Sequence, residues 1–344
     1  MNNDELLILK GGEVLSLLAG QEVKLIEIVR SAYETHGRKE DSLPHSVFLR
    51  FPDNEKNRII GLPALLGGEF AVAGIKWIAS FPDNHASGLD RASAAIILNS
   101  THTGRPEAIL EGSVISAKRT AASAALAAQV LHSNQDETSV GVIGCGLINF
   151  EVVRFLRKVF AGITNMVIFD VDASRTQQFK RLVSRGDDRL NVEIVDEVQA
   201  VLERCPLVSL ATTATQPYIY DLSMCPPAAT ILHVSLRDLM PEVILSCENI
   251  VDDIDHVCRA QTSIHLTEQK VGNRDFVKSE IADVLTGRIQ ARDDARRTVV
   301  FSPFGLGILD LALSKYVVEA AREQGSGTVL RQFLPPSWTE WPHE

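Results

Sequence analysis

The sequence contains no long hydrophobic run and no excess of basic residues. No stretch reaches about 18 uninterrupted apolar residues, so we expect no membrane-spanning helix. The first residues, MNNDELLILKGGEV, lack the basic and apolar segments of a secretory signal peptide. The net charge of −10 at pH 7 argues against nucleic acid or an anionic membrane as a partner. We therefore expect a cytoplasmic protein that binds neither.

Cysteine is also scarce. Only five cysteines occur among 344 residues, and no two of them have the CxxC spacing. An odd number without paired spacing favours free thiols in a reducing compartment. The nine histidines include no HxxxH or HxxEH pair. We therefore expect no metal site.

The first part of the chain is rich in strand-like runs. RIIGLPALL, FAVAGIKWIAS, SAAIILNS and EAILEG follow one another between residues 58 and 112, which predicts an antiparallel or mixed sheet. Residues 113–131 are rich in alanine and predict a closely packed helix. A last long helix is expected over about residues 304–323. The sequence leaves open whether this helix packs on the first domain or caps the second one.

From Thr138 onward the pattern changes to alternating strands and helices. SVGVIG, MVIFD, NVEIV, LVSLATT and TILHVSL are short apolar runs with connections between them. Strands of continuous apolar residues are typical of a parallel sheet that is covered on both faces. A chain of this length is long enough for two such domains.

The segment GVIGCGLIN joins the first of these strands to a helix. Gly144 would allow a tight turn, and Gly146 would let a pyrophosphate approach the helix N-terminus. Asn149 stands where such loops usually have a third glycine, so the motif is incomplete. We interpret this replacement as a packing change, in which the asparagine side chain bonds to the loop backbone.

An acidic residue is expected about 20 positions after a dinucleotide-binding loop. Asp170 closes the strand MVIFD, and Asp172 follows it. A carboxylate there would bind the ribose hydroxyls and repel a 2′-phosphate, which favours NAD over NADP. The alternative is that the acid merely caps the next helix.

Several basic residues interrupt apolar segments of the first domain. They are Arg50, Lys76, Arg91 and Arg119. Each has a structural alternative: an outward-pointing lysine at position 76, an ion pair at position 119, and surface or local contacts at positions 50 and 91. Together they fit a substrate that carries carboxylates.

Asp238 is the best candidate for an acid or base. It follows the strand-like run TILHVSL, and ligands of doubly wound sheets bind at the carboxyl ends of the strands. A loop aspartate that bonds to nearby backbone amides is the alternative interpretation. Glu242 is a nearby competitor. No nucleophile-elbow motif is present, so the sequence gives no support for serine chemistry.

These motifs, in this order, resemble the ornithine cyclodeaminase/μ-crystallin family. The resemblance covers about residues 40 to 325 and rests on GIKWI, RTAAS, GVIGCG, VIFD, ATTATQP and SPFGLGILDLA. It implies an α/β fold with two domains. A Rossmann-type doubly wound parallel sheet over residues 135–303 would bind NAD. A split α+β domain of residues 1–120 and 304–344 would bind the substrate and form a homodimer.

The resemblance also implies roles for single residues. Lys76 and Arg119 match binders of the substrate carboxylate, and Asp238 matches the catalytic aspartate. Lys76 is a second catalytic candidate, because its charge would favour an electron-poor carbon. Residues expected at the cofactor are Thr120, Gly144, Gly146, Leu147, Ile148, Asp170, Thr212, Thr213 and Ser235.

Longer segments resemble one branch, the dehydrogenases of 2,3-diaminopropionate biosynthesis in siderophore and peptide-antibiotic pathways. These segments are GGEFAVAGIKWIASFPDN, RASAAIILN, GCGLIN and SPFG. The branch implies oxidation of N-(2-amino-2-carboxyethyl)-L-glutamate by NAD+, followed by hydrolysis to 2-oxoglutarate and L-2,3-diaminopropionate. A partner synthase would make this conjugate from phosphoserine and glutamate. Its three carboxylates would be shared by Arg50, Lys76, Arg91 and Arg119.

Other functions stay open on the sequence. Ornithine cyclodeaminase would form no net NADH and would need a further acid, for which no clear candidate is present. An amino-acid dehydrogenase such as alanine dehydrogenase would not need Arg50 or Arg91. A μ-crystallin-like binding protein would hold a nucleotide and a ligand without turnover, and the presence of both Asp238 and Lys76 argues against it.

Overall fold

The computed structural model describes residues 5–340, which form two compact units. Unit 1 contains the residues up to Gln21, Arg38–Ser116 and the residues from Gly307 onward. Unit 2 contains Glu22–Gly37 and Ala117–Leu306. The sequence analysis placed residues 22–37 in the first domain. In the structure they form helix α2 (Glu22–Gly37), which belongs to unit 2. There it packs against α4 (Leu147–Val159) and α10 (Ile281–Leu285).

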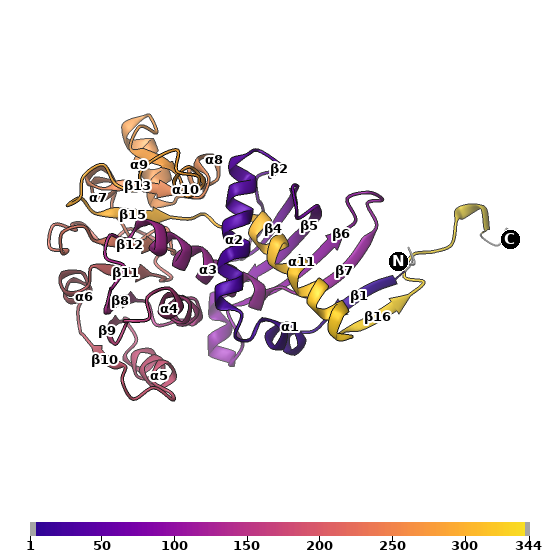
Figure 1. The fold of residues 1–344 in the computed structure, drawn as a ribbon, viewed down its shortest axis with the longest axis horizontal. Helices are drawn as coiled ribbons and strands as arrows, with labels where there is room; N and C mark the ends of the chain where they lie inside the picture. Colours follow the sequence, from indigo (N-terminus) through magenta and orange to yellow (C-terminus); the bar gives the residue numbers. More distant parts are fainter. Residues whose placement is uncertain (1–4, 341–344) are drawn as a thin grey trace. The chain divides into compact units, whose positions relative to one another are not determined.

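Unit 1 is built on one mixed sheet (Figure 1). Its strands are β1 (Glu5–Leu9), β2 (Asp41–Ser42), β3 (Val47–Phe51), β4 (Asn54–Leu66), β5 (Val72–Ser80), β6 (Ala92–Asn99), β7 (Pro106–Glu111) and β16 (Thr328–Arg331). The order is β16-β1-β7-β6-β5-β4-β2, and β3 also pairs with β4. Strands β4 to β7 pair antiparallel and correspond to the four strand-like runs of the sequence. Short helices α1 (Gly11–Leu18) and η1 (Pro82–Ser87) complete the connections.

Helix α11 (Gly307–Gln324) packs on one face of this sheet, against β4, β5 and β6 (Figure 1). The side chains of Leu62, Ala64, Ile96 and Leu98 are buried on this face. They occupy alternate positions of β4 and β6, as expected because successive side chains of a strand point to opposite faces. The last long helix therefore returns to the first unit, which answers the question that the sequence left open.

Helix α3 (Ser113–Leu131) occupies the residues predicted for it, and its part from Ala117 onward belongs to unit 2. Its alanines at 121, 122, 124, 125, 127 and 128 are fully buried. Small side chains let neighbouring elements approach this helix closely, which explains the alanine-rich composition. Among residues 5–340, no helix is long and apolar enough to span a membrane.

Unit 2 is a doubly wound parallel sheet. Its strands are β8 (Ser139–Ile143), β9 (Asn165–Phe169), β10 (Asn191–Ile194), β11 (Leu207–Leu210), β12 (Thr230–His233), β13 (Glu248–Val251), β14 (Val277–Glu280) and β15 (Val299–Ser302). The order is β10-β9-β8-β11-β12-β15-β13-β14, and every pair is parallel. The first five follow the Rossmann order, whose direction reverses between β8 and β11. The predicted fold class is confirmed.

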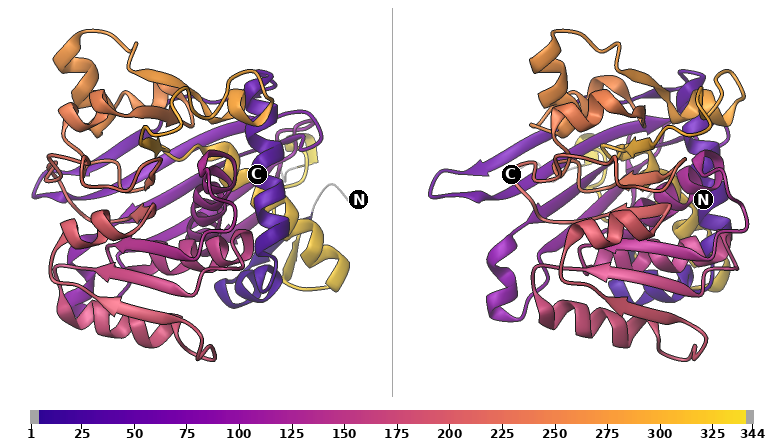
Figure 2. Two further views of the ribbon diagram at one scale, coloured as in Figure 1. Left: turned by 60° about the vertical axis from the view of Figure 1, so that its left-hand side comes forward. Right: turned by 90° about the vertical axis from the view of Figure 1, so that its left-hand side faces the viewer.

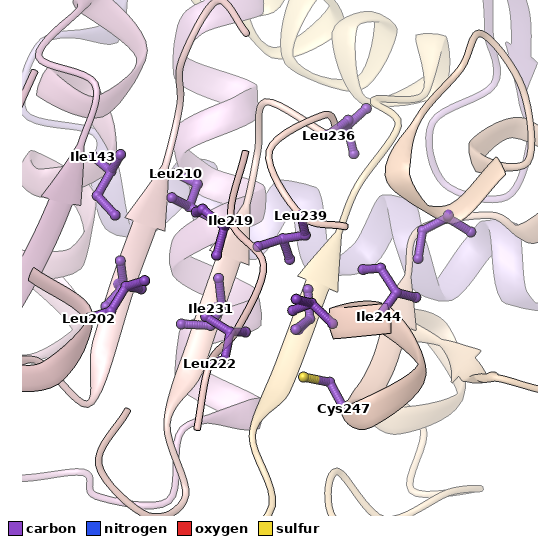
Figure 3. Packing of buried hydrophobic residues seen from close by; sticks show 14 of the residues in the cluster. Ile143, Leu202, Leu210, Ile219, Leu222, Ile231, Leu236, Leu239, Ile244 and Cys247 are labelled. Carbon is purple, nitrogen blue, oxygen red and sulfur yellow. The ribbon is translucent and has the colours of Figure 1, made fainter. Parts of the chain in front are cut away.

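Helices cover both faces of this second sheet (Figures 1 and 2). Besides α2, α3, α4 and α10 they are α5 (Ala173–Val183), α6 (Val198–Arg204), α7 (Pro241–Ser246), α8 (Ile254–Val257) and α9 (Ser263–Val271). Buried side chains from neighbouring strands, such as Ile143, Leu210 and Ile231, form one apolar cluster (Figure 3). Because each such side chain contributes about 1.5–3 kcal/mol on burial, this core holds the carboxyl ends of β8, β11 and β12 in fixed positions.

Candidate functional site

The glycine loop follows β8 at the point where the strand order reverses. Gly144 has a φ of +93°, and a Cβ there would lie 2.4 Å from the carbonyl oxygen of Ala211. Only glycine fits this position. Gly146 precedes α4, and a Cβ there would meet nothing within 4 Å. The N-terminus of α4 therefore opens onto space that suits a pyrophosphate.

Asn149 is fully buried beneath this loop. Its Nδ2 donates to the carbonyl oxygens of Gly144 at 2.7 Å and Ile143 at 3.0 Å, and its Oδ1 accepts from Ser209 Oγ at 2.7 Å. The asparagine thus bonds the loop to β8 and β11. The prediction that its side chain bonds to the loop backbone is confirmed.

Asp170 is the first residue after β9. Its Oδ2 accepts from the backbone N–H of Cys145 at 2.7 Å, and its Oδ1 accepts from that of Asp172 at 2.9 Å. The cap of α5 comes from Asp172 instead, whose side chain accepts from Ser174 N. The alternative interpretation as a helix cap therefore applies to Asp172, while Asp170 is fixed beside the loop where ribose hydroxyls could bond to it.

The other residues expected at the cofactor also belong to unit 2. Leu147 and Ile148 form the first turn of α4, and the Leu147 side chain is exposed. Thr213 follows β11, and Thr120 lies on α3. A nucleotide on the loop would meet the first turn of α4 and the end of β11, which meet at the β8/β11 reversal.

Asp238 is fully buried, five residues beyond the end of β12. Thr212 Oγ1 donates to its Oδ1, Ser235 Oγ donates to its Oδ2, and His233 Nε2 lies 3.2 Å from Oδ2. Burial by itself raises the pKa of Asp238, but the interactions with His233, Ser235 and Thr212 outweigh it and lower the pKa to about 2. The carboxylate is therefore ionised at neutral pH.

Thr212 connects this carboxylate to the glycine loop. A Cβ on Gly144 would lie 3.3 Å from the Cα of Thr212, whose hydroxyl contacts Asp238. Thr212 and Ser235 were expected at the cofactor, and in the structure both hydroxyls contact Asp238. The loop and the candidate base therefore meet at the carboxyl ends of β8, β11 and β12.

Glu242 and His233 are the other two titratable residues to compare with Asp238 as the candidate acid or base. Glu242 of α7 is exposed and paired with Lys270, so it is a surface residue rather than a competitor of Asp238. His233 is fully buried between Asp238 and Ser302, whose Oγ lies 3.1 Å from Nδ1. The sequence analysis did not select His233, because a single histidine in an apolar run gives no signal of its partners.

Lys76 lies in unit 1 and is only 2% exposed. Its Nζ lies 2.7 Å from Asp310 Oδ2 and 3.2 Å from Ser116 Oγ. The alternative of an outward-pointing lysine is therefore wrong. Asp310 comes from α11 and is itself fully buried, so the pair fixes the ammonium group in position. Sequence reasoning missed Asp310, although it lies in the segment SPFGLGILDLA.

Arg119 lies on α3 in unit 2 and is mostly buried. Its guanidinium group borders Gly305, where a Cβ would lie 2.7 Å from Nη1. Asp252 fixes the backbone at Phe304 and Gly305. Its carboxylate accepts from the backbone N–H groups of Phe304 at 2.8 Å and Gly305 at 2.7 Å. Burial raises the pKa of Asp252 to about 6. Asp252 is a third residue, after His233 and Asp310, that the sequence analysis missed.

Arg50 and Arg91 both lie in unit 1 with Lys76. Arg50 is directly opposite Arg58 in the pairing of β3 with β4, and Arg91 immediately precedes β6. The structure thus joins these two candidates to a third arginine, Arg58, that the sequence analysis did not select. Among residues 5–340, no group of three or more His, Cys, Asp or Glu side chains could hold a metal ion.

Comparison with known proteins gives matches along almost the whole chain. The profile of the ornithine cyclodeaminase/mu-crystallin family matches residues 19–325. The N-((2S)-2-amino-2-carboxyethyl)-L-glutamate dehydrogenase of Staphylococcus aureus is 27% identical, over 96% of this chain and 100% of the relative.

Two solved structures are similar in fold. An archaeal alanine dehydrogenase dimer with bound NAD has a TM-score of 0.85 and 26% identity, over 96% of this chain and 100% of the other. The Δ1-pyrroline-2-carboxylate reductase of Thermococcus litoralis, solved with NADH and L-proline, has a TM-score of 0.87 over 94% and 99% of the two chains. At 23% identity the latter shows the fold alone.

Proposed function

Because the chain belongs to the ornithine cyclodeaminase/mu-crystallin family, we propose that it oxidises N-(2-amino-2-carboxyethyl)-L-glutamate with NAD+. The predictions of an enzyme and of NAD as its cofactor are confirmed by the relatives, which include the Staphylococcus aureus dehydrogenase and an archaeal alanine dehydrogenase with bound NAD. The choice of this substrate is supported by the Staphylococcus aureus relative and by the branch motifs of the sequence.

The proposed reaction breaks one C–N bond of the conjugate. The glutamate α-carbon loses a hydride and its nitrogen loses a proton, which leaves an imine. Water then adds to the imine carbon, and the C–N bond breaks. Conjugate, NAD+ and water thus give 2-oxoglutarate, L-2,3-diaminopropionate, NADH and a proton.

The glycine loop and Asp170 would hold the cofactor. Backbone N–H groups at the start of α4 would bind the pyrophosphate next to Gly146, and the Asp170 carboxylate would accept from the ribose hydroxyls. Thr120, Leu147, Ile148, Thr212, Thr213 and Ser235 complete the proposed cofactor site. Bound NAD+ supplies the acceptor for the hydride.

Asp238 would act on the substrate nitrogen and on water. Its carboxylate is ionised at neutral pH, so it can take the proton from the amine and later orient the attacking water. The observation that carries the proposal is the position of this buried carboxylate. Through Thr212 it lies beside the same loop that suits the pyrophosphate, at the edge of the sheet where ligands bind.

Lys76 and Arg119 would bind the α-carboxylate at the reacting carbon. Asp310 fixes the Lys76 ammonium group and Asp252 holds the segment against Arg119, so both cations have defined positions. The charge of Lys76 would also favour the electron-poor carbon. Arg50 and Arg91 would bind the remaining carboxylates.

The proposal is tested by following NADH absorbance with purified protein, NAD+ and the synthetic conjugate, with ornithine and alanine in parallel. We expect NADH from the conjugate alone, with an equal amount of 2-oxoglutarate. Ammonia from ornithine without net NADH would make the protein a cyclodeaminase. NADH from alanine would make it an amino-acid dehydrogenase, and binding without turnover of any of the three would make it a binding protein.

The conjugate would come from a synthase that joins phosphoserine and glutamate, and the product would enter siderophore or peptide-antibiotic synthesis. We also propose a homodimer, since the archaeal alanine dehydrogenase is a dimer. Light scattering of the purified protein should give twice the mass of one 37.7 kDa chain.

A further inference from the structure

Three arginines lie at the same level across one end of the sheet in unit 1. Arg50 of β3 is directly opposite Arg58 of β4, and Arg58 is opposite Ser80 of β5. Ser80 is in turn opposite Ala92, the residue that follows Arg91. The carbonyl of Arg91 accepts from Phe81 N at 2.8 Å, which holds Arg91 beside the end of β5.

Arg50 and Arg58, which together with Arg91 are called the arginine cluster below, are on the same face of the sheet as Lys76. Arg91 immediately precedes β6 and is close enough to Arg58 for the two charges to interact. Residues directly opposite each other on neighbouring strands share a face, and so do alternate residues of one strand. Lys76 is opposite Leu62, and Arg58 is four residues from Leu62 along β4. At about 3.3 Å per residue, Arg58 and Lys76 are roughly 13 Å apart along the sheet.

In the part of the chain that the structure describes, the arginine cluster has no anionic partner. Within residues 5–340, none of its three guanidinium groups forms an ion pair with a carboxylate, and Arg58 Nε is buried without a hydrogen-bond partner. Burial and then the charge of Arg50 lower the pKa of Arg58, and burial and then Arg58 lower the pKa of Arg91. The charge of Arg58 is therefore close enough to those of Arg50 and Arg91 to repel both.

Such a group is unfavourable in the protein alone. Neighbouring like charges repel, and a buried N–H without an acceptor costs free energy. A bound carboxylate removes both costs, because each guanidinium offers two parallel N–H groups that match the two carboxylate oxygens. The cluster thus has the properties of an anion site rather than of a structural ion-pair network.

We propose that Arg58 is a specificity-determining residue, and that the arginine cluster binds the two carboxylates that are not attached to the reacting carbon. This inference rests on the proposed function and names the part of unit 1 that selects the substrate. Alanine, with one carboxylate, is too short to reach both Lys76 and the cluster. A conjugate with carboxylates at both ends can contact both.

The first test combines a change in the protein with a change in the substrate. Arg58→Met should lower kcat/KM for the conjugate about 10- to 100-fold, because charge-assisted hydrogen bonds are lost. For N-(2-aminoethyl)-L-2-aminobutyrate, which keeps the reacting amine and α-carboxylate but lacks the other two, the same variant should change kcat/KM less than about 3-fold. Equal losses with both compounds would overturn the proposal.

Two variants complete this test. Arg58→Lys should recover only part of kcat/KM, since an ammonium group lacks the two parallel N–H donors. Arg331→Met is the matched control, because Arg331 lies on β16 at the opposite edge of the same sheet. It should leave kcat/KM unchanged for both compounds.

A second measurement does not depend on turnover. Citrate, a tricarboxylate, should raise the melting temperature of the wild type and of Arg331→Met more than chloride at equal ionic strength, and should not do so for Arg58→Met. Without anions, Arg58→Met should melt at the same temperature as the wild type or higher, because one repelling charge is gone. A lower melting temperature with retained citrate response would make Arg58 a structural residue and overturn the proposal.

The two measurements separate the possible failures. If the wild type forms no NADH from the conjugate but citrate stabilises it through Arg58, the proposed substrate is wrong and the anion site stands. If the conjugate is oxidised and Arg58→Met oxidises it equally well, the proposed function stands and the arginine cluster has no role in it.

Discussion

Asn149 Nδ2 donates to the carbonyl oxygen of Gly144 at 2.7 Å, so the residue that interrupts the glycine motif supports the glycine that begins it. The same side chain accepts from Ser209 of β11. In loops with a third glycine, that position allows close packing of helix and strand. Here hydrogen bonds replace that contact, and the loop keeps its shape.

Asn149→Gly should therefore destabilise the protein although it completes the motif. The change leaves the Ser209 hydroxyl and two carbonyl groups without this partner, which costs about 1–3 kcal/mol. Urea unfolding measures the loss, and NAD+ titration should show weaker binding. Ser209→Ala should cost less in the Asn149→Gly background than in the wild type. Wild-type stability of Asn149→Gly would contradict this account.

Asp238→Asn should lower kcat by about 100-fold or more while the NAD+ dissociation constant changes little. The pKa of Asp238 is about 2, below its usual value, so the ionised form is favoured in the folded protein. Its contribution to stability is present above about pH 4 and is lost as the pH falls toward 2. The pH–rate profile of the wild type should therefore show no change in rate caused by titration of Asp238 between about pH 5 and 9.

The control for this residue is Glu242→Gln, which alters an exposed carboxylate paired with Lys270. It should leave both kcat and NAD+ affinity unchanged. If Asp238→Asn reduced kcat and NAD+ affinity to the same extent, Asp238 would hold the cofactor site together rather than act on the substrate.

Lys76→Met should abolish most turnover of the conjugate without weakening NAD+ binding. It also leaves the Asp310 carboxylate buried without its ammonium partner, which should cost about 3–5 kcal/mol in stability. Adding Asp310→Leu should recover most of that stability but none of the activity. Calorimetry and the NADH assay separate the two effects, and an unchanged rate in Lys76→Met would leave Lys76 with a structural role only.

Asp252→Asn should become more stable relative to the wild type as the pH rises. Burial raises the pKa of Asp252 to about 6, so the neutral form is favoured in the folded protein. The stability that it contributes is present below about pH 4 and is lost as the pH rises through 6, by about 3 kcal/mol. Asparagine does not ionise and shows no such loss. The melting temperatures of the wild type and of Asp252→Asn are compared at pH 4.5 and 7.5. If the two proteins differed by the same amount at both pH values, the pKa of Asp252 would not be raised.

Local patterns in the sequence were sufficient to predict much of the fold. The strand-like runs and the alanine-rich helix of residues 113–131 form as predicted, because alternation, helical spacing and glycine turns act over few residues. The glycine loop and Asp170 were recognised for the same reason. Their motif is contained in one strand, one turn, one helix and the strand that follows it.

Three of the missed residues depend on partners that are far away in the sequence. Asp310 is 234 positions from Lys76, and Asp252 is 53 positions from Gly305. Arg58 becomes notable only when the register of β3 and β4 places Arg50 opposite it and the pairing of β5 with β6 brings Arg91 near. Neither residue type nor spacing along the chain indicates such neighbours. These parts of the site could therefore be identified only from the structure.

The chain passes between its two units four times, after Gln21, Gly37, Ser116 and Leu306. During synthesis on the ribosome, all residues of unit 2 have been made once Leu306 is added. At that moment unit 1 still lacks α11 and β16, so β4, β5 and β6 lack the helix that covers them and Lys76 has no Asp310. Unit 1 therefore supplies the first strand to leave the ribosome, β1, but is the unit that finishes folding last.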